Sequence, residues 1–168
     1  MLIRVFADNT LEYGGVLYQC ALGRSGIRTD KHEGDGATPT GLYHLKRLYL
    51  RADRMTAVET GLPCVIIATD DGWCDDPAHP AYNRPVKLPF SAGHEKMWRD
   101  DPLYDLVIEI SHNDNPPVPG AGSAVFIHVA SDDYAATEGC IALKKSDLVA
   151  LLTDWSPATT IKISDRNA

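Results

Sequence analysis

A cysteine and a histidine lie twelve positions apart in the last third of the chain, at Cys140 in "TEGCIAL" and at His128 in "VFIHVA". A thiol attacks a carbonyl only as its thiolate, which needs a neighbouring base or cation and some access to solvent. His128 ends an apolar run typical of a strand, and residues 129–139 are long enough to fold back. The pair could therefore carry out acyl transfer, with Cys140 as nucleophile and His128 as base.

Spacing alone leaves a second interpretation open, and by itself favours it. Free cysteines are among the most buried residue types, so Cys140 could be a small core residue and His128 a core histidine with its hydrogen bonds satisfied. Gly139 fits the catalytic interpretation, because a residue without a Cβ lets backbone N–H groups approach a reacting carbonyl as an oxyanion hole.

Strands separated by long loops would have to position this pair. Runs rich in β-branched and aliphatic residues predict strands, including a hairpin whose two runs are separated by residues 8–15. The expected strands lie within residues 1–23 (the hairpin), 41–50, 64–68 (buried), 103–110, 122–130 and 159–164. Two short helices are expected, one within 91–105 with Ser91 as N-cap and Glu95 in its first turn, and one over 145–155 with Ser146 as N-cap.

Length and charge limit the function classes. A chain of 168 residues predicts one domain, residues 1–168. Asp and Glu outnumber Lys and Arg by 23 to 16, which disfavours nucleic acid as a partner. The apolar runs are too short for a membrane span, and the first residues lack the features of a signal peptide.

The four cysteines predict neither a disulfide scaffold nor a structural zinc site. One bridge, between Cys64 and Cys74, stays open, although Cys74 is otherwise interpreted as a structural residue. The acidic residues near position 70 lack the alternation of a calcium loop, so no essential metal and no cofactor is expected.

Three motifs carry a resemblance to a known family. In order, "GDGATPTGLYHL", "AVFIHVA" and "TEGCIAL" resemble the Gly-x-x-Thr-Pro-x-Gly loop, the histidine strand and the Ser-x-Gly-Cys turn of L,D-transpeptidases with a YkuD-like catalytic domain. The likeness extends from about residue 1 to 165, and Thr-Glu-Gly-Cys in place of Ser-His-Gly-Cys suggests a proteobacterial-type branch. It implies a mostly β fold of sandwich-like mixed sheets with one or two short helices, and it favours catalysis over the buried pair.

The resemblance also implies roles for single residues. Cys140 matches the nucleophile, His128 the base and Gly139 the position before the nucleophile, while the backbone carbonyl of Val129 would orient the imidazole. Two departures concern the turn: the family often has histidine at position 138 and arginine at position 142, where this chain has glutamate and alanine. Glu138 could hold the imidazole as imidazolium, or bind a cationic amine of the substrate.

The implied substrates are peptidoglycan stem peptides, as donor and acceptor muropeptides, joined through an acyl-enzyme thioester. The altered turn and the proline-rich loop before the histidine strand favour 1-3 over 3-3 crosslinks. A carbapenem adduct is expected, as are a monomer and a periplasmic or other cell-envelope location, with the cytoplasm as the alternative. The rival functions are an L,D-amide hydrolase of the same fold and a non-catalytic peptidoglycan-binding module.

Further substrate-binding candidates lie on loops. Tyr82, Asn83 and Arg84, on a long loop with Asp75 and Asp76, could line a groove or belong to a solvated turn. His112 follows an expected strand and is a candidate too, with a plain loop histidine as the alternative. Arg84 and Arg99 could hold a stem carboxylate through a bidentate fork, although an ordinary surface ion pair is favoured for Arg99.

Overall fold

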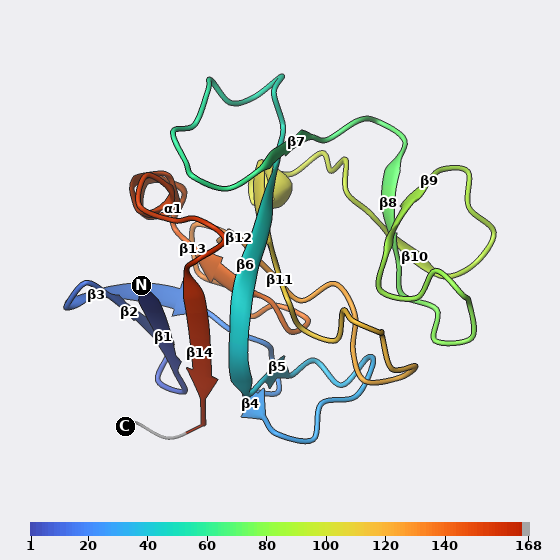
Figure 1. Cartoon of the computed structure of the whole chain (residues 1–168), viewed down its shortest axis with the longest axis horizontal. Helices are drawn as coiled ribbons and strands as arrows, with labels where there is room; N and C mark the ends of the chain where they lie inside the picture. Colours follow the sequence, from blue (N-terminus) through green and yellow to red (C-terminus); the bar gives the residue numbers. More distant parts are fainter. Residues whose placement is uncertain (166–168) are drawn as a thin grey trace.

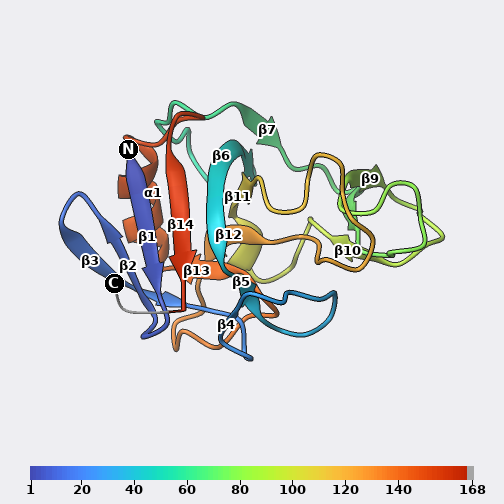
Figure 2. The same ribbon diagram turned by 60° about the horizontal axis from the view of Figure 1, so that its bottom comes forward.

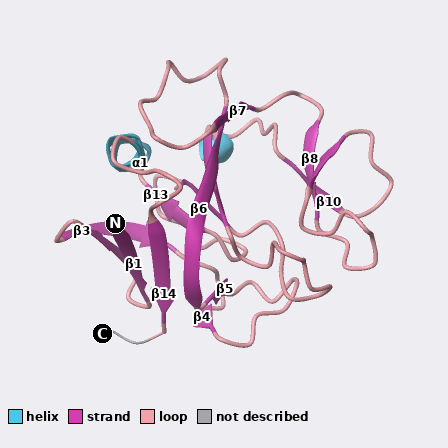
Figure 3. Ribbon diagram, in the orientation of Figure 1, coloured by secondary structure: helices cyan, strands magenta, loops and turns pink. Residues whose placement is uncertain are grey.

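The computed structural model describes residues 1–165, whose strands form three sheets. The large sheet contains β1 (Leu2–Phe6), β2 (Thr10–Tyr13), β3 (Val16–Ala21), β6 (Gly41–Leu50), β7 (Cys64–Ile66), β11 (Leu106–Ile110), β12 (Phe126–Val129), β13 (Ile141–Leu143) and β14 (Thr160–Ser164). The second contains β8 (Asp71–Cys74), β9 (Pro85–Lys87) and β10 (His94–Lys96), and the third pairs β4 (Ile27–Arg28) with β5 (Thr38–Pro39). The helices are α1 (Lys145–Leu152) and the short 3-10 helix η1 (Pro102–Tyr104) (Figures 1 and 3).

The large sheet closes on itself because β6 takes part in both of its halves. The N-terminal part of β6 pairs with β14, whereas its C-terminal part, from Leu45 to Leu50, pairs with β11. β3 makes a similar transition, since it pairs first with β2 and then, at Cys20 and Ala21, with β13. Strands that pass from one layer to the other form the corners of a β-sandwich. The predicted mostly β, sandwich-like mixed architecture is confirmed.

Helix α1 contributes one face to the main apolar core. Leu148, Leu151 and Leu152 are buried in that core, which confirms the amphipathic helix predicted over 145–155. The predicted N-cap is wrong: Lys144 occupies the cap position without a side-chain hydrogen bond, and Ser146 lies inside the first turn. The helix begins at Lys145, directly after Lys144, whose φ of −54° and ψ of 135° are not helical.

The helix predicted within residues 91–105 is wrong. Residues 94–96 form strand β10, in which Glu95 pairs with Trp73 of β8. The only helical turn in this segment is η1, capped by the Asp101 side chain, which accepts from the Leu103 N–H at 3.1 Å. Pairing with β8 satisfies the backbone groups of this segment, so cross-strand contacts override the local pattern that favoured a helix.

Three smaller expectations also need correction. Residues 8–15 do not merely connect two strands, because they contain β2. The run at 64–68 is not a buried strand: β7 is an edge strand in which Cys64 and Ile66 are exposed. A bridge between Cys64 and Cys74 is absent, since both are free thiols and Cys74 is fully buried on β8.

The small sheet of β8, β9 and β10 projects from one side of the sandwich, at the right in Figures 1 and 2. Side chains of β10 and of the loops around it approach the region of Cys140 and His128. Among the described residues, no helix is long and apolar enough to cross a membrane.

Candidate active site

Strands β12 and β13 are parallel neighbours, and their register fixes the positions of the histidine and the cysteine. His128 pairs with Ala142, and Ile127 pairs with Ile141. A tight turn cannot join parallel strands, so residues 130–140 form a long connection between them. Cys140 ends this connection directly before β13. The fold therefore brings the two predicted residues to the same region of the sheet.

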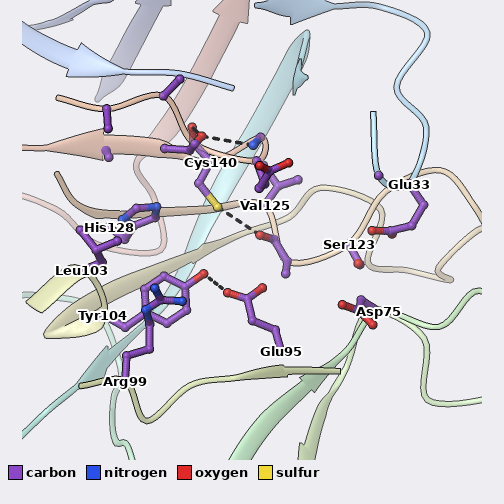
Figure 4. A pocket seen from close by; sticks show the side chains of 18 of the residues that line it. Glu33, Asp75, Glu95, Arg99, Leu103, Tyr104, Ser123, Val125, His128 and Cys140 are labelled. Carbon is purple, nitrogen blue, oxygen red and sulfur yellow. Dashed lines mark hydrogen bonds between the residues drawn. The ribbon is translucent and has the colours of Figure 1, made fainter. Parts of the chain in front are cut away.

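Both side chains line one cavity of about 540 Å³ (Figure 4). The β12–β13 connection supplies one wall, which includes Thr137, Glu138 and Gly139. The opposite wall comes from β10, η1 and the segments beside them. It contributes polar side chains that include Asp75, Glu95, Arg99 and Tyr104. Cys140 and His128, although both are largely buried, thus border a hollow large enough for part of a peptide.

The Cys140 thiol is protonated at neutral pH. It donates to the Ala124 carbonyl at 3.2 Å, and its sulfur accepts from the Phe126 N–H at 3.4 Å. Burial, with a smaller contribution from the nearby Glu95 carboxylate, raises the pKa of the thiol to about 12. Only 8% of the residue is exposed, on the cavity side. A base must therefore remove the thiol proton during attack.

The imidazole of His128 is in the form that can act as this base. Its Nδ1 lies 2.8 Å from the Val129 carbonyl, the contact that the family resemblance implied. A carbonyl can only accept, so Nδ1 carries the hydrogen and Nε2 has a free lone pair. Burial lowers the pKa of the ring to about 4. Tyr104 packs edge-on against the ring, with centroids 5.3 Å apart, and restricts its orientation.

The hydrogen bonds found within residues 1–165 do not join the ring of His128 to the sulfur of Cys140. The thiol is turned towards the Ala124 carbonyl instead. Catalytic hydrogen bonds are often loose without substrate, so a rotation of the thiol towards Nε2 would be part of the reaction.

Alkylation by iodoacetamide reports this resting state. We expect the alkylation rate of Cys140 to rise with pH through the neutral range and to keep rising beyond about pH 10, because the thiolate fraction is small below the thiol pKa. Peptide mapping by mass spectrometry would follow Cys140 separately from the exposed Cys64. Fast alkylation of Cys140 that is constant between pH 6 and 8 would contradict a protonated thiol.

Gly139 has a backbone that other residues rarely adopt. Its φ is +139°, and a Cβ there would lie 2.8 Å from the Ala37 carbonyl oxygen. The Gly139 N–H donates to Thr137 Oγ1 at 3.1 Å, while the Thr137 hydroxyl donates to the Cys140 carbonyl at 2.7 Å. The Gly139 N–H is therefore already engaged, and the Cys140 N–H becomes the better candidate donor for an oxyanion.

Comparison with known families identifies the domain. The family of L,D-transpeptidase catalytic domains known as YkuD matches residues 2–163. The chain belongs to this family. Two solved structures of the helical cell shape determining protein Pgp2 from Campylobacter jejuni, one of them a point mutant, are similar over 99% of this chain at 15% and 14% identity. Their TM-scores are 0.47 and 0.46, and the chain spans about half their length, 47% and 48%. The comparison with curated proteins gave no match.

Glu138 lies on the rim of the cavity in this YkuD domain. It forms an ion pair with Arg24 at 3.0 Å, and its side chain is 80% exposed. The expectation that Glu138 holds His128 as imidazolium is wrong, because burial lowers the pKa of the ring and leaves it neutral. Binding of a substrate amine by Glu138 would have to compete with Arg24.

The structure does not bring Tyr82, Asn83, Arg84 or His112 to the cavity lining. Asn83 is buried, and its Oδ1 accepts from the Trp73 indole at 2.9 Å and from the Ala124 N–H at 3.0 Å. Asn83 thus holds the segment whose carbonyl receives the Cys140 thiol. Asn83 stabilises the cavity wall from behind. It does not line the cavity, so the structure does not support direct contact with the substrate.

The other three candidates are also engaged elsewhere. The Tyr82 hydroxyl donates to Glu33 and accepts from the Gly122 N–H at 3.0 Å. Arg84 lines a separate hollow and donates to the Asp114 carbonyl. His112 is 9% exposed and packs edge-on against Tyr43, with centroids 5.5 Å apart.

Sequence reasoning missed the YkuD domain's polar wall opposite the cysteine. Arg99 does form the expected pair, its Nε donating to Asp101 at 2.9 Å, but it also lines the cavity and lies over the Tyr104 ring. Glu95 was expected in a helix, and η1 was not expected. From the sequence, Arg99 and Asp75 were possible substrate-binding residues. No local pattern placed Glu95 or Tyr104 at the site, because pairing with β8 positions this segment.

Acid should destabilise the domain through its two buried neutral histidines. Burial lowers the pKa of both His112 and His128 to about 4. The unfolded chain takes up these protons below about pH 6.5, whereas the folded chain does not until about pH 4. The free energy of unfolding should therefore fall with pH across this window, by up to about 1.4 kcal/mol per pH unit for each histidine.

Urea unfolding of a His112→Phe variant, which keeps a ring against Tyr43, should check this contribution. The stability difference between wild type and variant should shift against the wild type as the pH falls from about 6.5 to 4, and level off below. The raised pKa of Glu95 makes its contribution to stability grow as the pH falls, opposite to the histidines. This contribution is the same in both proteins and cancels in their difference. Parallel curves for the two proteins would contradict the buried neutral state of His112.

Proposed function

We propose that this chain is a cysteine-dependent L,D-transpeptidase that joins peptidoglycan stem peptides through an acyl-enzyme thioester. One observation supports this most directly: in a YkuD domain, the Cys140 thiol and the neutral His128 imidazole line one cavity. We assign Cys140 as nucleophile, His128 as base and Val129 as the residue that orients the ring. Gly139 supplies the backbone geometry that presents the cysteine.

The reaction would proceed in two half-reactions. Nε2 of His128 takes the thiol proton while the sulfur of Cys140 attacks the amide carbonyl at an L-centre, and the backbone N–H of Cys140 donates to the oxyanion. The C–N bond breaks, and the leaving amine takes the proton from the imidazolium. A thioester on Cys140 results. The side-chain amine of a diamino acid in a second stem then attacks this thioester, which forms the crosslink and restores the thiol.

We further propose that the crosslinks are of the 1-3 type, in a branch of the family with the Thr-Glu-Gly-Cys turn. Support comes from the rim of the cavity, where Glu138 replaces the usual histidine of the turn. The proline-rich loop at 113–120 leads directly to Ser123 and Ala124 on the cavity wall. Mass analysis of the products decides this point, since dimers of the 3-3 type alone would contradict it.

We place the enzyme at the cell envelope, where its proposed substrate lies. In bacteria that have a periplasm, we propose a periplasmic location. We propose that residues 1–168 act as one catalytic domain and as a monomer. Size-exclusion chromatography with light scattering tests the monomer, and a mass of twice 18.4 kDa would contradict it.

Purified muropeptides, incubated with the protein with and without an acceptor amine, test the function as a whole. We expect crosslinked dimers when the acceptor is present, and an intact-protein mass increased by one drug molecule on Cys140 after carbapenem treatment. Cleavage that does not depend on the acceptor would indicate the hydrolase instead. Muropeptide binding without turnover or adduct would indicate a binding module.

A further inference from the structure

Glu95 is a carboxylate in the cavity wall that forms no ion pair with a basic side chain of residues 1–165. It is the central residue of β10, and its side chain points into the cavity, across from the sulfur of Cys140 (Figure 4). Within residues 1–165, the ion pairs do not include Glu95, and its hydrogen bond comes from the Tyr104 hydroxyl. A carboxylate can accept about four hydrogen bonds, so most of its capacity faces the hollow unused.

The groups around Glu95 make it a stronger proton acceptor than an exposed carboxylate. Burial raises its pKa, and the carboxylates of Asp75 and Glu33 add to this effect. The Tyr104 hydroxyl and Arg99 act in the opposite direction. Arg99, however, is already held by Asp101 through both Nε and Nη2. A cation entering the cavity therefore meets a carboxylate whose desolvation is only partly compensated.

The second half-reaction needs such an acceptor. An aliphatic amine is protonated at neutral pH and has no lone pair with which to attack a thioester. One proton must leave before attack and a second must leave during it. The neutral imidazole of His128 can take the second proton, because its Nε2 is free. A second acceptor beside the site of attack would take the first and raise the fraction of amine that can react.

We propose that Glu95 binds the ammonium group of the acceptor stem and removes the proton that blocks its lone pair. This inference rests on the proposed transferase function. The amine nitrogen, freed by Glu95, attacks the thioester carbonyl, so that a C–N bond forms and the C–S bond breaks. His128 takes the remaining excess proton from nitrogen and returns it to the sulfur of Cys140. Glu95 then releases its proton to solvent. Its carboxylate thus selects a cationic amine over water.

A Glu95→Gln variant tests this role, because glutamine keeps the shape and the oxygen that accepts from Tyr104 but cannot take a proton. With a muropeptide donor and a lysine side-chain amine as acceptor, we expect the ratio of transfer to hydrolysis to fall about 100-fold. Glu59→Gln is the matched control, since Glu59 is exposed and outside the cavity lining, and it should leave the ratio unchanged.

A second acceptor separates proton removal from a structural effect. Hydroxylamine is uncharged at neutral pH and needs no proton acceptor, so its transfer rate should be the same in wild type and Glu95→Gln. An equal loss with both acceptors, or an equal loss of transfer and hydrolysis, would overturn the role of Glu95.

Detection of the acyl-enzyme separates a failure of the proposed transferase function from a failure of the role of Glu95. If wild type forms no thioester, or forms one that reacts only with water, the proposed transferase fails and this role of Glu95 fails with it. If wild type transfers efficiently and Glu95→Gln keeps the same transfer ratio, only the role of Glu95 is overturned.

Discussion

Replacing Cys140 with alanine is expected to abolish turnover, with a loss of at least about 10⁴-fold in kcat. Alanine offers no nucleophile, and His128 alone cannot form the thioester on which both half-reactions depend. Intact-protein mass spectrometry should show no donor or carbapenem adduct on the variant. The muropeptide assay then measures the residual rate.

The fold should survive this change. The Cys140 side chain is small, and within residues 1–165 its sulfur makes two long hydrogen bonds, to Ala124 and Phe126. Muropeptide binding and the thermal unfolding midpoint should stay close to the wild-type values. Cys64→Ala is the control, because Cys64 is an exposed free thiol on an edge strand. It should keep both turnover and the adduct, whereas a Cys140→Ala variant with unchanged turnover would remove the nucleophile from the mechanism.

Gly139→Ala is expected to cost at least about 2 kcal/mol of stability and to reduce activity together with it. The position combines a φ of +139° with a backbone oxygen, that of Ala37, 2.8 Å from where the Cβ would lie. Backbone cannot move aside as a flexible side chain can, so either the cysteine turn or the segment around Ala37 must shift. Thermal unfolding and the rate of thioester formation measure the two effects.

Gly26→Ala separates conformational strain from steric contact. Gly26 also has a positive φ, +75°, but no atom of the described residues lies within 4 Å of the position that a Cβ would occupy there. It should cost only about 1 kcal/mol and leave thioester formation unchanged. If Gly139→Ala behaves like Gly26→Ala in both measurements, the contact with Ala37 does not constrain the cysteine turn.

The sequence predicted those parts of the fold in which local pattern and tertiary contacts agree. The apolar runs around His128 and at the C-terminus became β12 and β14, and the leucines of α1 face the core as their spacing predicted. The order of motifs pointed to the YkuD family, and the family match over residues 2–163 agrees.

The candidate site was only partly predictable, because half of it depends on pairing between distant segments. The segment with Glu95 has a helix-like pattern but takes its conformation from β8. Tyr82 and Asn83 were attractive as polar loop residues, yet their polar atoms are used inside the protein. Whether a polar side chain is hydrogen-bonded inside the protein or available to a substrate depends on its neighbours in three dimensions. Sequence composition does not identify these neighbours.

The cavity is formed jointly by two separately hydrogen-bonded sheets, with the thiol on the sandwich and Glu95 on the small sheet of β8, β9 and β10. Because the two sheets do not share hydrogen-bonded strands, the sequence of one sheet can change without altering the strand pairing of the other. Replacement or lengthening of the small sheet would change which molecules are admitted without disturbing the ladder that presents the nucleophile. Swapping residues 70–100 between relatives should therefore alter the acceptor step, in which Glu95 takes part, while thioester formation on Cys140 is retained.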